Sequence, residues 1–193
     1  ADLLAAALEA GRRYAAAYAE AKRRAGAVDF NDLIARTLAL FAQPGIGEWV
    51  RFKLDLATEH VLIDEAQDTN PEQWAIVRAL VDEFFAGEGA RVAGLRTLFV
   101  VGDYKQAIFG FQGTDPVYFK AAHQLFDQRA AVAPEYDTEA QPLDTLSLTE
   151  SFRSTAPVLE FVDAAIDAFP QPGMGYMEER LQHASRVAGP GTV

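Results

Sequence analysis

The sequence predicts an α/β fold with a parallel sheet, and two observations support this fold class. Two short apolar runs, residues 61–63 and 98–101, each end abruptly in polar residues, as the strands of a buried parallel sheet do. Segments with apolar residues at helical spacing precede, separate and follow these runs. Strands that alternate with helices favour parallel pairing, and ligands of such sheets bind at the carboxyl ends of the strands.

The first part of the chain predicts three helices. Residues 1–25 are rich in alanine and carry apolar side chains four positions apart, which indicates one long helix that Gly26 ends. Asp29 is expected to cap the next helix, with Asp32 three residues on in the capping-box position. That helix has one apolar face, and a shorter helix is expected at 48–56.

The remaining elements follow the first strand. Asn70 and Pro71 predict the cap and first turn of a helix after that strand. A third strand is expected at 146–148 and a last helix at 157–168. Stretches rich in proline, glycine or acidic residues predict a surface loop and a connector or frayed end, at 128–144 and 170–193 respectively.

Composition excludes several classes of protein. Of the 193 residues, 50% are hydrophobic, enough for a proper core, which excludes wholesale disorder. Acids outnumber bases by 28 to 17, and this net charge of -11 argues against a broad, nonspecific grip on nucleic acid or anionic membrane, although not against a narrow groove. The absence of cysteine excludes disulfides, thiolate nucleophiles and cysteine-bound zinc. No apolar run reaches about 18 residues, so no membrane span is expected.

A first polar cluster, residues 64–70, follows the first strand and reads Asp-Glu-Ala-Gln-Asp-Thr-Asn. Here Asp64 can hold Mg²⁺, a hard cation that prefers carboxylate, water and phosphate oxygens. Its neighbour Glu65 can orient or deprotonate a water for attack on a phosphoryl group. The alternative interpretation is a solvated acidic turn in which Asp68 and Asn70 act as helix caps.

A second cluster, residues 102–113, follows the second strand. Gly102 allows a tight turn off the strand, and Gln106 is a neutral donor that can sense a terminal phosphate. Phe109 and Phe111 lie two positions apart beside glycines, and loop aromatics of this kind can stack on single-stranded bases. The alternative for the two phenylalanines is packing in the core.

A third cluster, residues 150–154, follows the expected third strand and contains Arg153. An arginine just past a strand end can bind phosphate through two hydrogen bonds or stabilise charge that develops in phosphoryl transfer. The alternative is a surface arginine paired with one of the many carboxylates.

In this order and spacing, the clusters resemble the UvrD-like superfamily 1 DNA helicases. Residues 61–70 resemble the Walker B motif of that family, and residues 100–113 resemble the next motif, which links nucleotide to DNA. Residues 148–154 resemble the later motif that carries a phosphate-contacting arginine. The string Asp-Phe-Asn-Asp-Leu at 29–33 matches the short signature where the chain returns from a helical insertion to the first motor domain.

Within the family, the chain looks most like the AddA-type helicase–nuclease subunit of bacterial double-strand-break repair. The similarity lies in the string at 102–113 followed by Asp115 and Pro116, and in Ser-Phe-Arg-Ser-Thr-Ala-Pro at 151–157. A UvrD, PcrA or RecB type of repair helicase stays open as an alternative.

The resemblance implies a role for each matching residue. Asp64 would coordinate Mg²⁺ and Glu65 would activate the hydrolytic water. Gln106 would report the γ-phosphate of ATP, and Arg153 would stabilise it.

The resemblance also implies a DNA contact. Phe109 and Phe111 would stack on bases of single-stranded DNA. Gln112 stands where many relatives have arginine, so the link from nucleotide to DNA would be tuned differently, and Ala107 stands where serine is usual.

The fold that the resemblance implies is a partial RecA-like P-loop NTPase domain. Residues 1–27 would end a helical insertion, 28–150 would be the second part of the first motor domain, and 151–193 would hold the arginine motif and the start of the second domain or a connector. No Gly-x-x-x-x-Gly-Lys-[Ser/Thr] phosphate loop occurs in the sequence, so its backbone cradle and lysine are missing. We therefore expect an internal piece of a longer protein that is inactive alone.

The implied function is that of an ATP-dependent 3′–5′ DNA helicase in the bacterial cytoplasm, which couples ATP hydrolysis to movement along single-stranded DNA during recombinational repair. Its implied partners are single- and double-stranded DNA and an AddB-like second subunit, with no membrane. A superfamily 2 helicase is one alternative, because Asp-Glu-Ala-Gln at 64–67 permits it, but the Gly-Asp-x-Lys-Gln string replaces the Ser-Ala-Thr-like motif expected there. A degenerate motor domain kept as a scaffold is the other alternative.

Overall fold

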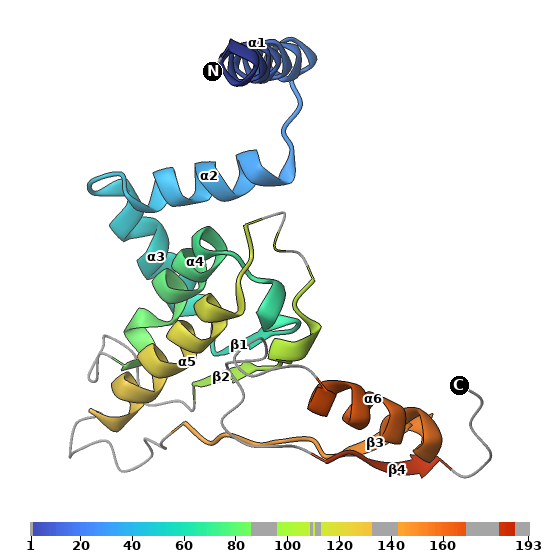
Figure 1. Cartoon of the computed structure of the whole chain (residues 1–193). Helices are drawn as coiled ribbons and strands as arrows, with labels where there is room; N and C mark the ends of the chain where they lie inside the picture. The colour runs from blue at the N-terminus through green and yellow to red at the C-terminus, as the bar shows by residue number, and fades with distance from the viewer. Residues whose placement is uncertain are drawn as a thin grey trace. The chain divides into compact units, whose positions relative to one another are not determined.

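The computed structural model describes residues 2–85, 96–108, 110, 113–132, 143–168 and 182–187. The chain forms two compact units, Ala1–Phe52 and Lys53–Val193, and each is described by itself. Figure 1 shows the elements of both. None of the described helices is both long enough and apolar enough to span a membrane.

The first unit contains the three expected helices: α1 (Asp2–Ala25), α2 (Phe30–Phe41) and the first part of α3 (Ile46–Ala57). Gly26 follows α1 with a φ of 61°, a left-handed conformation that glycine adopts without steric cost. The predicted capping box is confirmed, since the Asp29 carboxylate accepts from the Asp32 N–H at 2.9 Å and the Asp32 carboxylate accepts from the Asp29 N–H at 3.1 Å.

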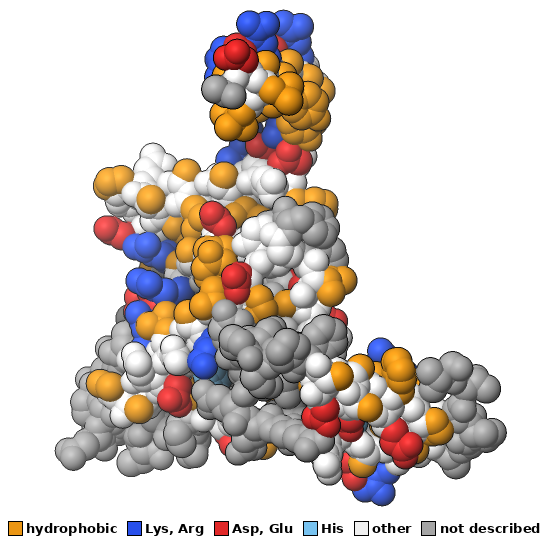
Figure 2. Space-filling model, in the orientation of Figure 1, with side chains coloured by type: hydrophobic (Ala, Val, Ile, Leu, Met, Phe, Trp, Pro, Cys, Tyr) orange, Lys and Arg blue, Asp and Glu red, His pale blue; other side chains and the backbone are white. Residues whose placement is uncertain are grey.

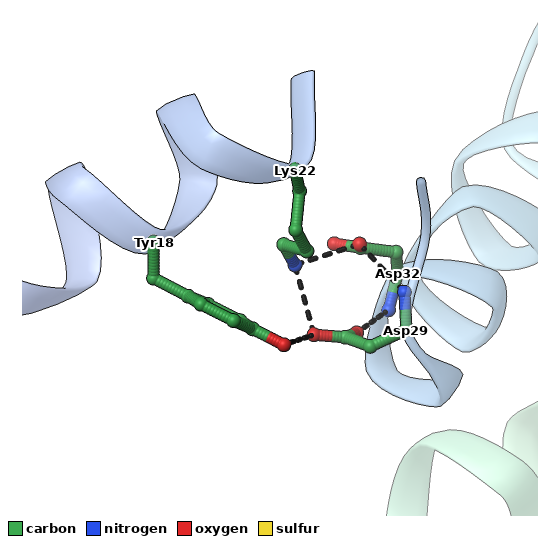
Figure 3. A network of polar contacts seen from close by, with 4 residues as sticks. All are labelled: Tyr18, Lys22, Asp29 and Asp32. Atoms are coloured by element: carbon green, nitrogen blue, oxygen red, sulfur yellow. Dashed lines mark hydrogen bonds and ion pairs between the residues drawn. The ribbon is translucent and has the colours of Figure 1, made fainter. Parts of the chain in front are cut away.

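Polar contacts tie the end of α1 to the start of α2 (Figure 3). Lys22 Nζ lies 2.9 Å from Asp29 Oδ2 and 2.7 Å from Asp32 Oδ2, and the Tyr18 hydroxyl donates to Asp29 Oδ2 at 3.2 Å. The hydrogen bond from Lys22, followed by that from the Asp32 backbone, lowers the pKa of Asp29 to about 2. One lysine therefore pairs with both carboxylates of the capping box.

Helix α1 is amphipathic and has no buried residue. In Figure 2 its hydrophobic side chains gather on one side and most of its basic side chains on the opposite side, whereas Lys22 points to Asp29 and Asp32. Two glutamates each hold two arginines along the basic side: Glu9 pairs with Arg12 and Arg13, and Glu20 pairs with Arg23 and Arg24. Such i, i+3 and i, i+4 pairs support an exposed helix that has little tertiary packing.

The second unit contains the expected parallel strand pair. Strand β1 (His60–Ile63) pairs with β2 (Thr97–Val100), and Val61 lies opposite Leu98. The helix predicted after β1 is α4 (Pro71–Val81), and the Asn70 side chain caps it by accepting from the Gln73 N–H at 2.9 Å. A single 3₁₀ turn, Asp82–Phe85, continues α4.

The core of this unit lies between the strands and two helices. The buried side chains of α4 and of α5 (Pro116–Ala131) pack with the inward residues of both strands. This cluster includes Trp74, Val81, Phe126, Val61 and Val100. Helix α5 extends into the surface loop expected at 128–144, because its alanine-rich end continues the helix and Arg129 bonds Asp82; residues 133–142 of that loop lie outside the described part of the chain.

The prediction that both faces of these strands are buried is wrong for the described residues. Leu62 and Phe99, which point away from the core, are 72% and 58% exposed. The reason is that the described helices α4 and α5 pack on the face that carries Val61 and Leu98. The pair therefore alternates between a core face and an open apolar face.

The third strand also differs from its prediction. Residues 146–148 form no strand, and Leu146 and Leu148 are exposed. The strand is β3 (Glu150–Thr155), because its parallel partner β4 (Ala184–Val187) pairs with those residues. The connector expected at 170–193 thus contains a strand, while residues 169–181 and 188–193 lie outside the described ranges. The last helix is α6 (Ala156–Ala168), one residue longer than expected at its start.

Candidate functional site

The polar loops after β1 and β2 lie side by side, as the sequence predicts for neighbouring parallel strands. The Val101 N–H donates to the Ile63 carbonyl at 2.8 Å, and the Ala66 N–H donates to the Val101 carbonyl at 2.9 Å. These bonds continue the ladder beyond both strands. The cluster at 64–70 and the start of the cluster at 102–113 therefore meet at one edge of the sheet.

Glu65 has an unusual backbone conformation. Its φ is 52° and its ψ is 44°, and among the described residues it is the one non-glycine with positive φ. A side chain in this left-handed region costs about 1–3 kcal/mol, and such strain tends to gather at functional sites. The Asp64 carboxylate accepts from the Glu65 N–H at 2.9 Å, which supports the turn.

Gln67 connects the two loops. Its side chain is 1% exposed. Its Nε2 donates to Glu65 Oε2 at 2.7 Å, and its Oε1 accepts from the Asp103 N–H at 2.9 Å. The sequence assigns this residue no role, because an uncharged amide in a polar string carries no signal of what it will contact 36 positions away.

Asp103 organises the second loop. Its Oδ1 accepts from the Lys105 N–H and lies 3.0 Å from Lys105 Nζ, and its Oδ2 accepts from Gln106 Nε2 at 3.1 Å. Burial raises the pKa of Asp103, but the hydrogen bonds from Gln106 and Lys105 outweigh it, so the pKa stays below its ordinary value. Asp103 is therefore an ionised anchor that holds the Gln106 side chain.

Position 102 requires glycine because a side chain would not fit there, and not because its backbone has a conformation that only glycine adopts. Its φ is not positive. A Cβ at this position would lie 2.7 Å from Phe119 Cε1, 2.9 Å from Gln67 Oε1 and 3.0 Å from Ala66 Cβ. The two loops approach each other so closely that no side chain fits between them.

The predicted site residues are thus brought together in part. Asp64 and Glu65 are exposed at the end of β1, and Gln106 is exposed in a 3₁₀ turn after β2. Arg153 is also exposed but lies inside β3 rather than past a strand end, because the strand forms later in the chain than expected. Phe109, Phe111 and Gln112 lie outside the described residues.

The carboxylates of Asp64 and Glu65 fit Mg²⁺ better than they fit a metal ion whose ligands all come from the protein. Among the described residues, no group of three or more His, Cys, Asp or Glu side chains could hold a metal ion. Mg²⁺ commonly binds through one or two carboxylates and keeps water and substrate phosphate as its other ligands. The exposed carboxylate of Asp64, next to Glu65, fits this donor set.

The fold and the site point to an α/β protein that works at adjacent strand ends, and comparison with known proteins places it among the helicases. Residues 7–127 match the family model described as the UvrD/REP helicase N-terminal domain, and the chain belongs to this family. The resemblance seen in the sequence is confirmed, and the match does not support the superfamily 2 alternative.

The names of similar proteins are consistent with membership of this family. The chain is 36% identical over 149 residues to the A subunit of the ATP-dependent helicase/nuclease of Exiguobacterium sibiricum, a match that covers 77% of this chain and 11% of the relative. It is 34% identical over 155 residues to the protein of the same name from Geobacillus thermodenitrificans, with the same coverage of both chains. It is 32% identical over 163 residues to the ATP-dependent DNA helicase UvrD1 of Mycobacterium leprae, covering 80% of this chain and 18% of the relative. The similarity to the AddA type is confirmed, and the chain spans only 11–18% of the length of these relatives.

Proposed function

We propose that this chain is part of an ATP-dependent DNA helicase of the AddA type, which moves 3′–5′ along single-stranded DNA in double-strand-break repair. Membership of the UvrD/REP family and the names of the relatives support this proposal. In this proposal the strand pair β1–β2 belongs to a RecA-like motor domain. Residues 1–27 end a helical insertion, 28–150 belong to the first motor domain, and 151–193 lead into the second.

One observation carries the assignment of the site. Glu65 and Gln106 stand at adjacent strand ends, both exposed, and side-chain hydrogen bonds through Gln67 and Asp103 link them. An acceptor for a proton of the attacking water and a neutral donor to the phosphate oxygens are two groups that serve hydrolysis of a terminal phosphate. A solvated acidic turn has no need of such a link.

The proposed roles follow from the chemistry of each group. Asp64 would hold Mg²⁺, which when bound supplies positive charge to the phosphate oxygens. Glu65 accepts a hydrogen bond from the attacking water and takes its proton. Gln106 donates to the terminal phosphate, and Arg153 binds the same phosphate after the second motor domain closes on the first.

The proposed DNA contact uses stacking more than charge. Phe109 and Phe111 stack on bases of single-stranded DNA, with Gln112 beside them. The net charge of -11 over 193 residues supports this choice, because a chain so acidic offers little general attraction to phosphate. In the proposed protein a second helicase–nuclease subunit, AddB-like, completes the complex, and the complex works on DNA in the cytoplasm.

ATP turnover by variants of the proposed full-length protein tests this function. Glu65→Gln removes the proton acceptor and is expected to lower DNA-stimulated turnover by about 10²–10⁴, with nucleotide binding retained. Glu83→Gln is the matched control, because Glu83 is exposed in the 3₁₀ turn at the end of α4 opposite to the cluster at 64–70, and it should leave turnover unchanged.

The 193-residue chain by itself offers a second test. It has no phosphate loop, so we expect no measurable turnover from it alone. Robust DNA-stimulated turnover from this chain would contradict the proposed division of the site. Full activity of Glu65→Gln in the longer protein would instead refute the role given to Glu65, and an absence of turnover in the unmodified longer protein would favour the scaffold alternative.

A further inference from the structure

We propose that Gln67 is a positioning residue that couples the Glu65 carboxylate to the loop that carries Gln106. The inference deepens the proposed function and rests on it, because it gives the site a path from the water-activating group to the loop on which the proposed DNA contact lies. The path consists of three hydrogen bonds, from Glu65 to Gln67, from Gln67 to Asp103 and from Asp103 to Gln106. We call this path the Gln67 relay.

The chemistry of the partners fixes the direction of each bond. The Asp103 backbone N–H can only donate, so it must meet the amide oxygen of Gln67. The Glu65 carboxylate can only accept when ionised, so it must meet the amide nitrogen. A side chain that accepts at one end and donates at the other, with this length and no charge, is a glutamine.

Burial makes the relay stiff. Gln67 is 1% exposed, and the neighbouring Ala66 is fully buried. The close approach of Gly102 leaves no free space beside the Gln67 oxygen. Since little water reaches the amide to replace a lost partner, the side chain must move with its partners or leave a buried polar group unpaired.

The strain at Glu65 suggests which end of the relay moves. The left-handed backbone of this residue is held by neighbouring contacts, among them its N–H bond to Asp64 and its side-chain bond to Gln67. A change in the hydrogen bonding of the Glu65 carboxylate, such as a water that arrives with nucleotide, competes with the bond from Gln67. The relay passes that change to the backbone of Asp103 and, through its carboxylate, to Gln106.

A merely structural role for Gln67 predicts something different. In that case Gln67 fills space and satisfies two polar groups, and its loss destabilises the unit without linking the loops. Stability alone cannot separate the two roles, so the test needs a readout at Asp103 when the perturbation is made at Glu65.

Nuclear magnetic resonance of the 193-residue chain provides that readout. The perturbation is Glu65→Ala, and the signals followed are the backbone amide of Asp103 and the side-chain amides of Gln67 and Gln106. Glu83→Ala is the matched control, because Glu83 is an exposed glutamate in the 3₁₀ turn after α4 and stands outside the relay. We expect Glu65→Ala to shift all three signals and to speed hydrogen exchange of the Asp103 amide by about tenfold. Glu83→Ala should leave the Asp103 and Gln106 signals in place.

Making Glu65→Ala in a Gln67→Met background completes a double-mutant cycle. Methionine has the length of glutamine without its donor or acceptor, so Glu65→Ala should no longer reach Asp103 in that background. Gln73→Met is the control for the loss of a glutamine, because Gln73 belongs to the α4 capping box and not to the relay. If Gln67→Met does not fold, the comparison of Glu65→Ala with Glu83→Ala decides by itself.

Two results would overturn the relay: a Gln67 signal that shifts while Asp103 stays in place, or an Asp103 shift that persists in the Gln67→Met background. Neither measurement uses ATP turnover. If the Asp103 signal responds to Glu65→Ala but the Glu65→Gln enzyme is active, the proposed function is refuted and this inference is not. If the Asp103 signal does not respond but the Glu65→Gln enzyme is inactive, only this inference is refuted.

Discussion

Gly102 offers the sharpest test of how tightly the two loops pack. Replacing it with alanine places a methyl group 2.7 Å from Phe119, 2.9 Å from the Gln67 oxygen and 3.0 Å from Ala66. Inserting a carbon into a packed site costs about 1–3 kcal/mol. Alanine also lowers the conformational entropy of the unfolded chain, which stabilises the folded protein by about 0.4–1 kcal/mol. We therefore expect the free energy of unfolding to fall by about 1–2 kcal/mol in total.

Gly110→Ala is the matched control. Gly110 follows Gly102 in the same polar cluster, has no atom within 4 Å of the position that a Cβ would take, and has no positive φ. Its substitution should bring only the entropic gain, so the two variants should differ by about 2 kcal/mol in the free energy of unfolding.

Urea unfolding followed by tryptophan fluorescence measures this difference. The chain has two tryptophans, Trp49 in the first unit and Trp74 in the core of the second. A Trp49→Phe background leaves Trp74 as the reporter of the unit that contains Gly102. If Gly102→Ala proves as stable as Gly110→Ala in this background, the described contact between the two loops is wrong.

Two further predictions concern the first unit. The pKa of Asp29 in the folded chain, about 2, lies below its ordinary 3.8, so its ionised form favours folding; that contribution is complete above about pH 4 and is lost as the pH falls towards 2. Circular dichroism should therefore show the stability advantage of the wild-type chain over Asp29→Asn shrinking across this range, and an advantage that grows on acidification would refute the role of Lys22. Gly47→Ala places a Cβ 2.2 Å from the Phe41 carbonyl oxygen, a backbone atom that cannot move aside, and should cost at least about 3 kcal/mol; an unchanged midpoint of thermal unfolding would contradict that close approach.

The elements that depend on local chemistry can be predicted from the sequence. Asp29 and Asn70 are recognisable as caps because each bonds an N–H three positions along. Strands β1 and β2 are recognisable because their apolar runs stand out from polar neighbours. For the caps, the signal and the contact lie within three residues of each other; for the strands, the signal lies within each run, although the two runs pair 37 positions apart.

The features that depend on distant partners could not be predicted. Strand β3 reads Glu-Ser-Phe-Arg-Ser-Thr, which has no apolar run, and it forms where the distant β4 aligns with it. Gln67 joins Glu65 to the backbone of Asp103, and a backbone N–H has no sequence signature. The need for glycine at position 102 likewise comes from three side chains on other segments, not from the turn in which it stands.

The contacts of Lys22 have a consequence for how α1 opens. The helix buries none of its residues, and the described polar contacts that tie it to α2 all come from Tyr18 and Lys22 near its carboxyl end. We expect α1 to unfold progressively from Asp2 towards its carboxyl end. Its last turns and the first turn of α2 should form and break together in one cooperative step. The rate of local unfolding should therefore decrease along α1 and be lowest near Lys22, which contacts both Asp29 and Asp32.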